Sequence, residues 1–190
     1  MSLLLTGLVL FFAVHSISIV NNPWREVMVQ RLGIWTWKGL YSLVALAGLV
    51  LMIKGYGLAR IDPTMLYLPA RWLTHLAMLL MLPVFPLLLA TYFPGRIKAA
   101  VGHPMLLATI LWAFSHLLVN GSLADVLLFG AFLAWAFIDL LSATRRTQRP
   151  LPGAPESKRN DVIAVIGGLG FYAAFVVWLH AVLLGVPLVG

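Results

Sequence analysis

The sequence predicts an all-α integral membrane protein, a bundle of about six transmembrane helices with one interfacial amphipathic helix. Of its 190 residues, 62% are hydrophobic and only 10% are charged, whereas soluble domains are roughly half apolar and about a quarter charged. The mean hydropathy is +0.97. This composition excludes a disordered chain, an ordinary cytosolic enzyme and a nucleic-acid-binding protein built on a basic soluble domain. The length fits one domain over residues 1–190.

Six apolar stretches are long enough, or nearly long enough, to cross a bilayer, which takes roughly 20 residues. They are residues 2–20, 39–58, 70–93, 103–119, 122–142 and 162–184. Pro83 and Pro86 should kink the third stretch. Ser122 and Asp125 form an S-x-x-D capping box that opens the fifth, so Asp125 is interpreted as a helix cap and not as a catalytic acid. The sixth stretch carries two small-xxx-small pairs, Ala164 with Gly168 and Gly170 with Ala174.

The basic residues predict the orientation in the membrane. The loops at 21–38, 94–102 and 143–161 hold ten of the 13 Lys and Arg residues, namely Arg25, Arg31, Lys38, Arg96, Lys98, Arg145, Arg146, Arg149, Lys158 and Arg159. The remaining three lie on the other side. Since basic loops stay in the cytoplasm, both termini should face the periplasm of a bacterium, with the chain in the inner (cytoplasmic) membrane.

Residues 23–37 predict a separate helix at the membrane interface. Asn22 can cap a helix that begins with Pro23. One helical stripe then carries Trp24, Val27, Met28, Arg31 and Trp35. Arg31 is the charged member of this stripe. Its side chain has two interpretations, as an arginine that reaches lipid phosphate or as an anchor for a bound anion such as a haem propionate.

Histidines are the side chains with metal-ligand chemistry, because the chain has no cysteine. The absence of thiols excludes disulfides, thiolate nucleophiles and cysteine-ligated haem or iron–sulfur clusters. The five histidines are His15, His75, His103, His116 and His180. A single histidine in a membrane helix is more often a structural hydrogen-bonding group, but five in one small protein favour a metal or haem site.

Helical spacing and depth add detail to the histidines. Thr109, Trp112, His116 and Asn120 share one helix face, so Asn120 could orient the His116 ring; an interhelical hydrogen bond of His116 is the alternative. With a rise of ~1.5 Å per residue, depth alone pairs His15 with His103 towards the cytoplasm. The same reasoning gathers a second cluster, His75, His116 and His180, towards the periplasm.

Asp139 is the one acidic residue deep within an apolar stretch, and Arg145 or Arg146 can reach it from the helix end. So few intramembrane carboxylates, and no internal repeat, argue against a transporter.

Residues 102–130, GHPMLLATILWAFSHLLVNGSLADVLLFG, resemble the NnrU family of small membrane proteins. Further pieces of the resemblance are His15-Ser16, Arg31-Leu32-Gly33, and His180 with Leu184-Gly185-Val186-Pro187. The family name implies a link to nitrite and nitric oxide reduction (denitrification). A plant relative, 15-cis-zeta-carotene isomerase, holds haem b through histidines, and its ligand positions correspond to His15 and His116. That enzyme also has a cysteine three residues before the second histidine, where this chain has Ala113.

The resemblance thus implies a haem b protein working in electron transfer, redox sensing or isomerisation. The haem is expected near Trp112 and Phe114, with Arg31 near a propionate. Two alternatives stay open. One is an S-adenosylmethionine-dependent methyltransferase, suggested by Gly102-His103-Pro104, and the other is a non-enzymatic assembly factor for nitrite and nitric oxide reductases. The expected partners are the lipid bilayer, a hydrophobic small molecule and a membrane protein, with no nucleic acid. The substrate, if the protein has one, is not indicated by the sequence.

Overall fold

The computed structural model describes residues 1–146 and 151–188, and these form helices joined by short turns and loops. In this part of the chain there is no β-strand, only an isolated antiparallel bridge between Met65 and Ser122. The prediction of an all-α fold is therefore confirmed. The described residues gather into two compact units, 1–69 with 120–146 and 70–119 with 151–188, which are described separately below.

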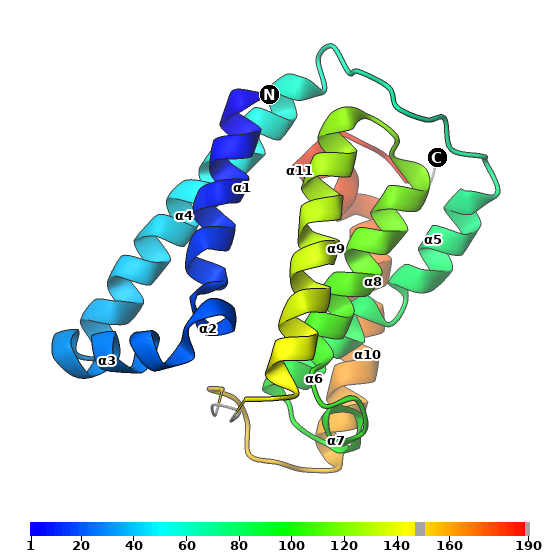
Figure 1. The fold of residues 1–190 in the computed structure, drawn as a ribbon. Helices are drawn as coiled ribbons and strands as arrows, with labels where there is room; N and C mark the ends of the chain where they lie inside the picture. The colour runs from blue at the N-terminus through cyan, green and yellow to red at the C-terminus, as the bar shows by residue number, and fades with distance from the viewer. Residues whose placement is uncertain (147–150, 189–190) are drawn as a thin grey trace. The chain divides into compact units, whose positions relative to one another are not determined.

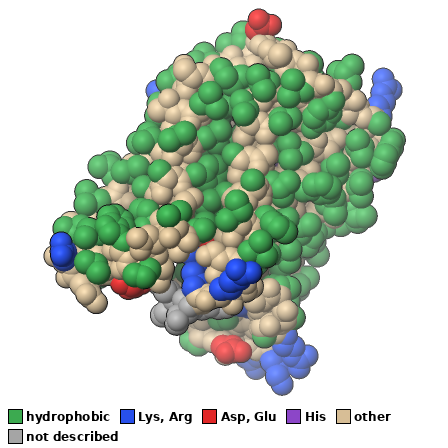
Figure 2. Space-filling view, in the orientation of Figure 1, with side chains coloured by type: hydrophobic (Ala, Val, Ile, Leu, Met, Phe, Trp, Pro, Cys, Tyr) green, Lys and Arg blue, Asp and Glu red, His purple; other side chains and the backbone are tan. Residues whose placement is uncertain are grey.

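Four helical segments are long and apolar enough to cross a membrane: Ile34–Ala59, Leu73–Tyr92, Leu123–Ala143 and Arg159–Leu184. Two shorter apolar helices, Ser2–His15 and Pro104–Val119, occupy the first and fourth predicted spans. Apolar side chains predominate on the face shown in Figure 2. The membrane character of the chain is thereby supported, while the count of six spans stays a prediction.

The first unit is built on an antiparallel pair, α1 (Ser2–His15) along α4 (Ile34–Ala59) (Figure 1). Three glycines let the two backbones touch. A Cβ on Gly7 would lie 2.5 Å from the Met52 nitrogen, and one on Gly48 would lie 2.8 Å from the Phe11 nitrogen. Gly55 meets the backbone of Leu4 in the same way. Any side chain at these positions would push the helices apart.

The interfacial helix is shorter than predicted. After α2 (Ile17–Val20), α3 covers Asn22–Leu32 and ends at Gly33, whose φ of 80° and ψ of 152° suit glycine alone. Trp35 consequently belongs to α4, where it is 80% exposed, and does not continue the stripe of Trp24. The cap is also displaced by one residue, since Asn21 Oδ1 accepts from the Trp24 amide at 2.9 Å.

The predicted capping box opens α9 (Leu123–Ala143) and is confirmed. The Asp125 amide donates to Ser122 Oγ at 3.2 Å, and the Ser122 amide donates to Asp125 Oδ2 at 2.9 Å. The Tyr56 hydroxyl donates to the other carboxylate oxygen at 2.6 Å, which ties α4 to the start of α9. Asp125 is buried and fully hydrogen-bonded, as expected of a cap.

The second unit contains the helices of the remaining apolar stretches. In chain order they are α5 (Leu73–Met81), α6 (Val84–Tyr92), α7 (Arg96–Val101), α8 (Pro104–Val119), α10 (Arg159–Ala174), the π-helix η1 (Phe175–Leu179) and α11 (His180–Leu184). The break between α5 and α6 falls at Pro83, as predicted. Gly168 touches the backbone of Pro86, so α10 packs closely on α6, whereas Gly170 faces open space.

Replacing Gly48 by Ala should destabilise the protein by about 2 kcal/mol, because the added methyl overpacks the α1–α4 contact. Gly57→Ala is the matched control on the same helix, since a Cβ there meets no atom within 4 Å. Its effect should stay within about 0.5 kcal/mol. Thermal unfolding of both variants in detergent measures the difference. Equal stability of the two variants would show that α1 and α4 are not held in close contact.

Candidate functional site

His15 lies at the end of α1, where three helices of the first unit supply aromatic walls. The Phe11 ring stacks on the imidazole with centroids 3.9 Å apart. Tyr41 of α4 and Trp135 of α9 approach edge-on, at 5.2 and 5.8 Å. Together with the neighbouring ion pair of Asp139 and Arg146, these residues form what we call the His15 cluster: Phe11, His15, Tyr41, Trp135, Asp139 and Arg146. It gives the half-buried imidazole a largely aromatic environment.

The hydrogen bond of His15 defines which ring nitrogen is available. Nδ1 lies 2.7 Å from the carbonyl oxygen of Phe11, one turn earlier in the same helix. A carbonyl can only accept, so Nδ1 carries the proton and donates. In the neutral ring the lone pair is then on Nε2, which has no hydrogen-bond partner among the described residues. This is the tautomer of a histidine that binds a metal through Nε2, with its other nitrogen held by a backbone carbonyl.

An ion pair completes the His15 cluster. Arg146 Nη2 donates to Asp139 Oδ1 at 2.6 Å, and the two side chains are 25% and 12% exposed. The predicted pairing of Asp139 with Arg145 or Arg146 is therefore confirmed for Arg146. The Asp139 charge also acts on both His15 and Tyr41. Both partners belong to α9 and the turn that follows it, so the pair stabilises the C-terminal end of α9.

Two N–H donors of the His15 cluster are buried without an acceptor among the described residues. They are Nε1 of Trp135 and Nη1 of Arg146. Buried donors are almost always hydrogen-bonded, to protein, to ordered water or to a ligand. Both lie on side chains that border His15 or its neighbour Asp139. The cluster thus combines an open ligand nitrogen with two donors that need an acceptor.

In the second unit, His116 repeats the backbone geometry of His15. Its Nδ1 lies 2.7 Å from the carbonyl of Trp112, and the two rings are 5.2 Å apart. The orienting group shown here is a backbone carbonyl, while the orienting role of Asn120 stays a prediction. His15 belongs to the first unit, and both His116 and His103 belong to the second. The pairing of His15 with either one also stays a prediction.

The other histidines have different surroundings. His180 begins α11 after η1, and its Nδ1 lies 2.7 Å from the Val186 carbonyl. His75 is exposed in the first turn of α5, and His103 directly precedes Pro104 at the start of α8. Over residues 1–146 and 151–188, no three His, Asp or Glu side chains converge on a common metal position. The second histidine cluster predicted from depth therefore gains no support.

Arg31 was the arginine predicted from the sequence as an anion anchor, but Arg146 is the arginine that lies near His15. Arg31 lies exposed in the last turn of α3. Arg146 is the cation that the structure brings into the His15 cluster. Tyr41 and Trp135 also belong to the cluster, and neither was predicted from the sequence as a site residue. A signal for Trp135 was present, because it lies four residues before Asp139 and so shares a face of α9 with the one deep acid.

The fold and the candidate site define a small helical membrane protein with oriented histidines inside its apolar helices. A family model described as NnrU protein matches residues 3–188, and the chain belongs to the NnrU family. No curated protein and no solved structure matched the chain.

Asp139→Asn should destabilise the protein by about 3 kcal/mol, because it leaves the partly buried Arg146 cation without its partner. The double variant Asp139→Asn, Arg146→Met should recover part of that loss by removing the cation as well. Thermal unfolding of the two variants and the parent protein tests the pair. A double variant less stable than Asp139→Asn alone would contradict the interpretation.

Proposed function

We propose that the protein is a b-type haem membrane protein in which His15 binds the haem iron through Nε2. The observation that carries the proposal is the combination, in the His15 cluster, of an imidazole whose Nδ1–H is held by the Phe11 carbonyl with two buried N–H donors that have no acceptor in the described residues. Neutral imidazole is the commonest metal ligand in proteins and holds haem iron axially in many of them.

The residues around His15 suit a haem. Phe11, Tyr41 and Trp135 offer apolar ring surfaces of the kind that lie against a porphyrin. The unpartnered donors on Trp135 and Arg146 suit the oxygen atoms of a propionate. Arg146 replaces Arg31 as the proposed propionate partner, because it is the arginine that lies in the His15 cluster.

When bound, a haem supplies a one-electron redox centre whose potential depends on axial ligation and burial. The residues of this chain would hold it, keep the His15 tautomer fixed and limit access of water. The family resemblance supports His116 as the second histidine that would bind the iron, and His103 is the alternative. Redox or sensing work linked to nitrogen-oxide metabolism fits this proposal better than isomerisation, because Ala113 stands where the related isomerase has a cysteine.

His15→Ala should abolish the low-spin bis-histidine haem spectrum or empty the site, because the axial nitrogen is removed. Visible spectra of detergent-purified protein, oxidised and reduced, measure this at matched protein and haem. His75→Ala is the control, since His75 is exposed in the first turn of α5.

The same spectra identify the second ligand. With His116 as the ligand, His116→Ala reproduces the loss and His103→Ala keeps the parent spectrum, and with His103 the two results reverse. An unchanged spectrum for His15→Ala would refute the proposed ligand. A colourless parent protein, expressed with ample haem, would favour the methyltransferase or assembly-factor alternative.

Trp135→Phe should speed haem loss about five-fold, because it keeps the ring but removes one N–H donor, which contributes about 1 kcal/mol. Trp178→Phe is the matched control, since Trp178 is 62% exposed in η1. Haem transfer to an acceptor protein such as apomyoglobin gives the rate. Identical rates for the two variants would show that Trp135 Nε1 makes no bond to the haem.

A further inference from the structure

The second unit carries a basic pocket at the end where two candidate spans meet. α6 ends at Tyr92, and α10 begins at Arg159. The segment that precedes α10 is fixed to the end of α6 by backbone bonds. The Ala154 amide donates to the Tyr92 carbonyl at 2.8 Å, and the Ser157 amide donates to the Pro94 carbonyl at 3.1 Å. Residues 151–158 therefore form an ordered wall beside α7.

The carboxylate next to this wall, that of Asp161, already accepts hydrogen bonds from the protein. Asp161 accepts from the Arg96 and Ile97 amides, both at 3.0 Å, and so caps the start of α7. Gly95 allows this approach, since a Cβ there would lie 2.5 Å from Asp161 Oδ1. The Lys98 ammonium donates to the Thr91 carbonyl at 3.1 Å. The helix terminus and Lys98 are thus satisfied by the protein itself.

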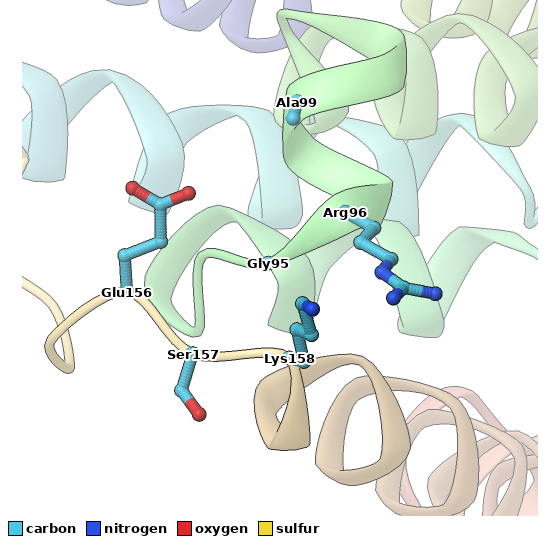
Figure 3. Close-up of a pocket in the computed structure, with 6 residues that line it drawn as sticks. All are labelled: Gly95, Arg96, Ala99, Glu156, Ser157 and Lys158. Carbon is cyan, nitrogen blue, oxygen red and sulfur yellow. The ribbon is translucent and has the colours of Figure 1, made fainter.

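Between α7 and the wall lies a pocket of about 400 Å³, which we call the Arg96–Lys158 pocket. It is lined by Gly95, Arg96, Ala99, Glu156, Ser157 and Lys158. In Figure 3 the ends of Arg96 and Lys158 extend to one side of the pocket and the Glu156 carboxylate to the other. Within the described residues neither cation forms an ion pair. The lining consequently carries a net positive charge.

The pocket lies at the ends of two apolar helices, and this position indicates which anion could bind there. Both spans, Leu73–Tyr92 and Arg159–Leu184, end at this pocket, which is the level of lipid phosphates in a bilayer. Tyr92 at the end of α6 is 44% exposed, as is typical of an interfacial aromatic residue. The first turns of α10 expose Val162 and Ile166, at 58% and 68%, where acyl chains can lie.

We propose that the Arg96–Lys158 pocket binds the phosphate headgroup of an anionic phospholipid. Arg96 offers a planar fork to the phosphate oxygens, and Lys158 adds a mobile second charge. A zwitterionic lipid should bind less tightly, because its own cationic group is repelled by Arg96 and Lys158. This site is distinct from the His15 cluster, which lies in the first unit.

Binding of dioleoylphosphatidylglycerol to the full-length protein in detergent, followed by native mass spectrometry, tests the proposal. Arg96→Gln and Lys158→Gln should each weaken binding about five-fold, which corresponds to about 1 kcal/mol per basic residue at an anionic surface. Arg159→Gln is the matched control, since it removes one charge beside the pocket but does not line it. Glu156→Gln should strengthen binding, and Arg96→Lys should retain most of it.

Four results would overturn the proposal. The first is unchanged binding to the Arg96→Gln, Lys158→Gln double variant, provided it elutes and melts like the parent protein. The second is equal binding of dioleoylphosphatidylcholine, which would indicate an apolar surface only. The third is full competition by millimolar inorganic phosphate, which would make free phosphate the ligand. The fourth is a loss of lipid binding for Arg159→Gln as large as for Arg96→Gln, which would show that general surface charge, and not the pocket, attracts the lipid.

Discussion

The close contact between α1 and α4 determines where the His15 cluster forms. Inside a bilayer, helices gain little from hydrophobic burial against one another, so their association depends on close packing and on polar contacts. Gly7, Gly48 and Gly55 supply the packing, because they let the two backbones touch along most of α1. The same contact sets the register that brings His15 level with Tyr41. α9 is held at its start by the bond from the Tyr56 hydroxyl to Asp125, and further along by Trp135, whose ring packs edge-on against His15.

Features that depend on residues close in sequence could be predicted. The apolar stretches, the Ser122–Asp125 capping box and the break at Pro83 each arise from local chemistry, and the Asp139–Arg146 pair joins residues seven apart. Other features arise from packing between distant segments. Trp135 faces His15 only because α9 lies against α1, and Asp161 caps a helix 65 residues earlier. The sequence places Trp135 on the same helix face as Asp139, but it does not indicate that this face meets His15 or that Asp161 caps α7.

Two local features were also missed, and each has a physical reason. Gly33 interrupts an apolar and aromatic pattern that is otherwise continuous, and a glycine in such a pattern can be tolerated within a helix or can end it. Its φ of 80° shows that here it ends α3. The π-helix η1 at Phe175–Leu179 adds one residue per turn without any Pro or Gly inside it. Such bulges are frequent at functional sites, and this one directly precedes His180.

Three histidines share the same hydrogen-bond geometry, so this geometry does not by itself identify the haem ligand. His15, His116 and His180 each have Nδ1 at 2.7 Å from a backbone carbonyl, so in each neutral ring the proton lies on Nδ1 and the lone pair on Nε2. The first two achieve this inside their own helix, with the carbonyl four residues earlier, and need no carboxylate to fix the tautomer. Orientation alone therefore cannot select a haem ligand among them. What distinguishes His15 is that its cluster holds two buried N–H donors, on Trp135 and Arg146, with no acceptor in the described chain, whereas beside His116 only the Ser115 hydroxyl is buried without a partner. A ligand that supplied both a metal for Nε2 and oxygen atoms for these donors would satisfy the whole cluster at once, which is the reason for proposing a haem site there.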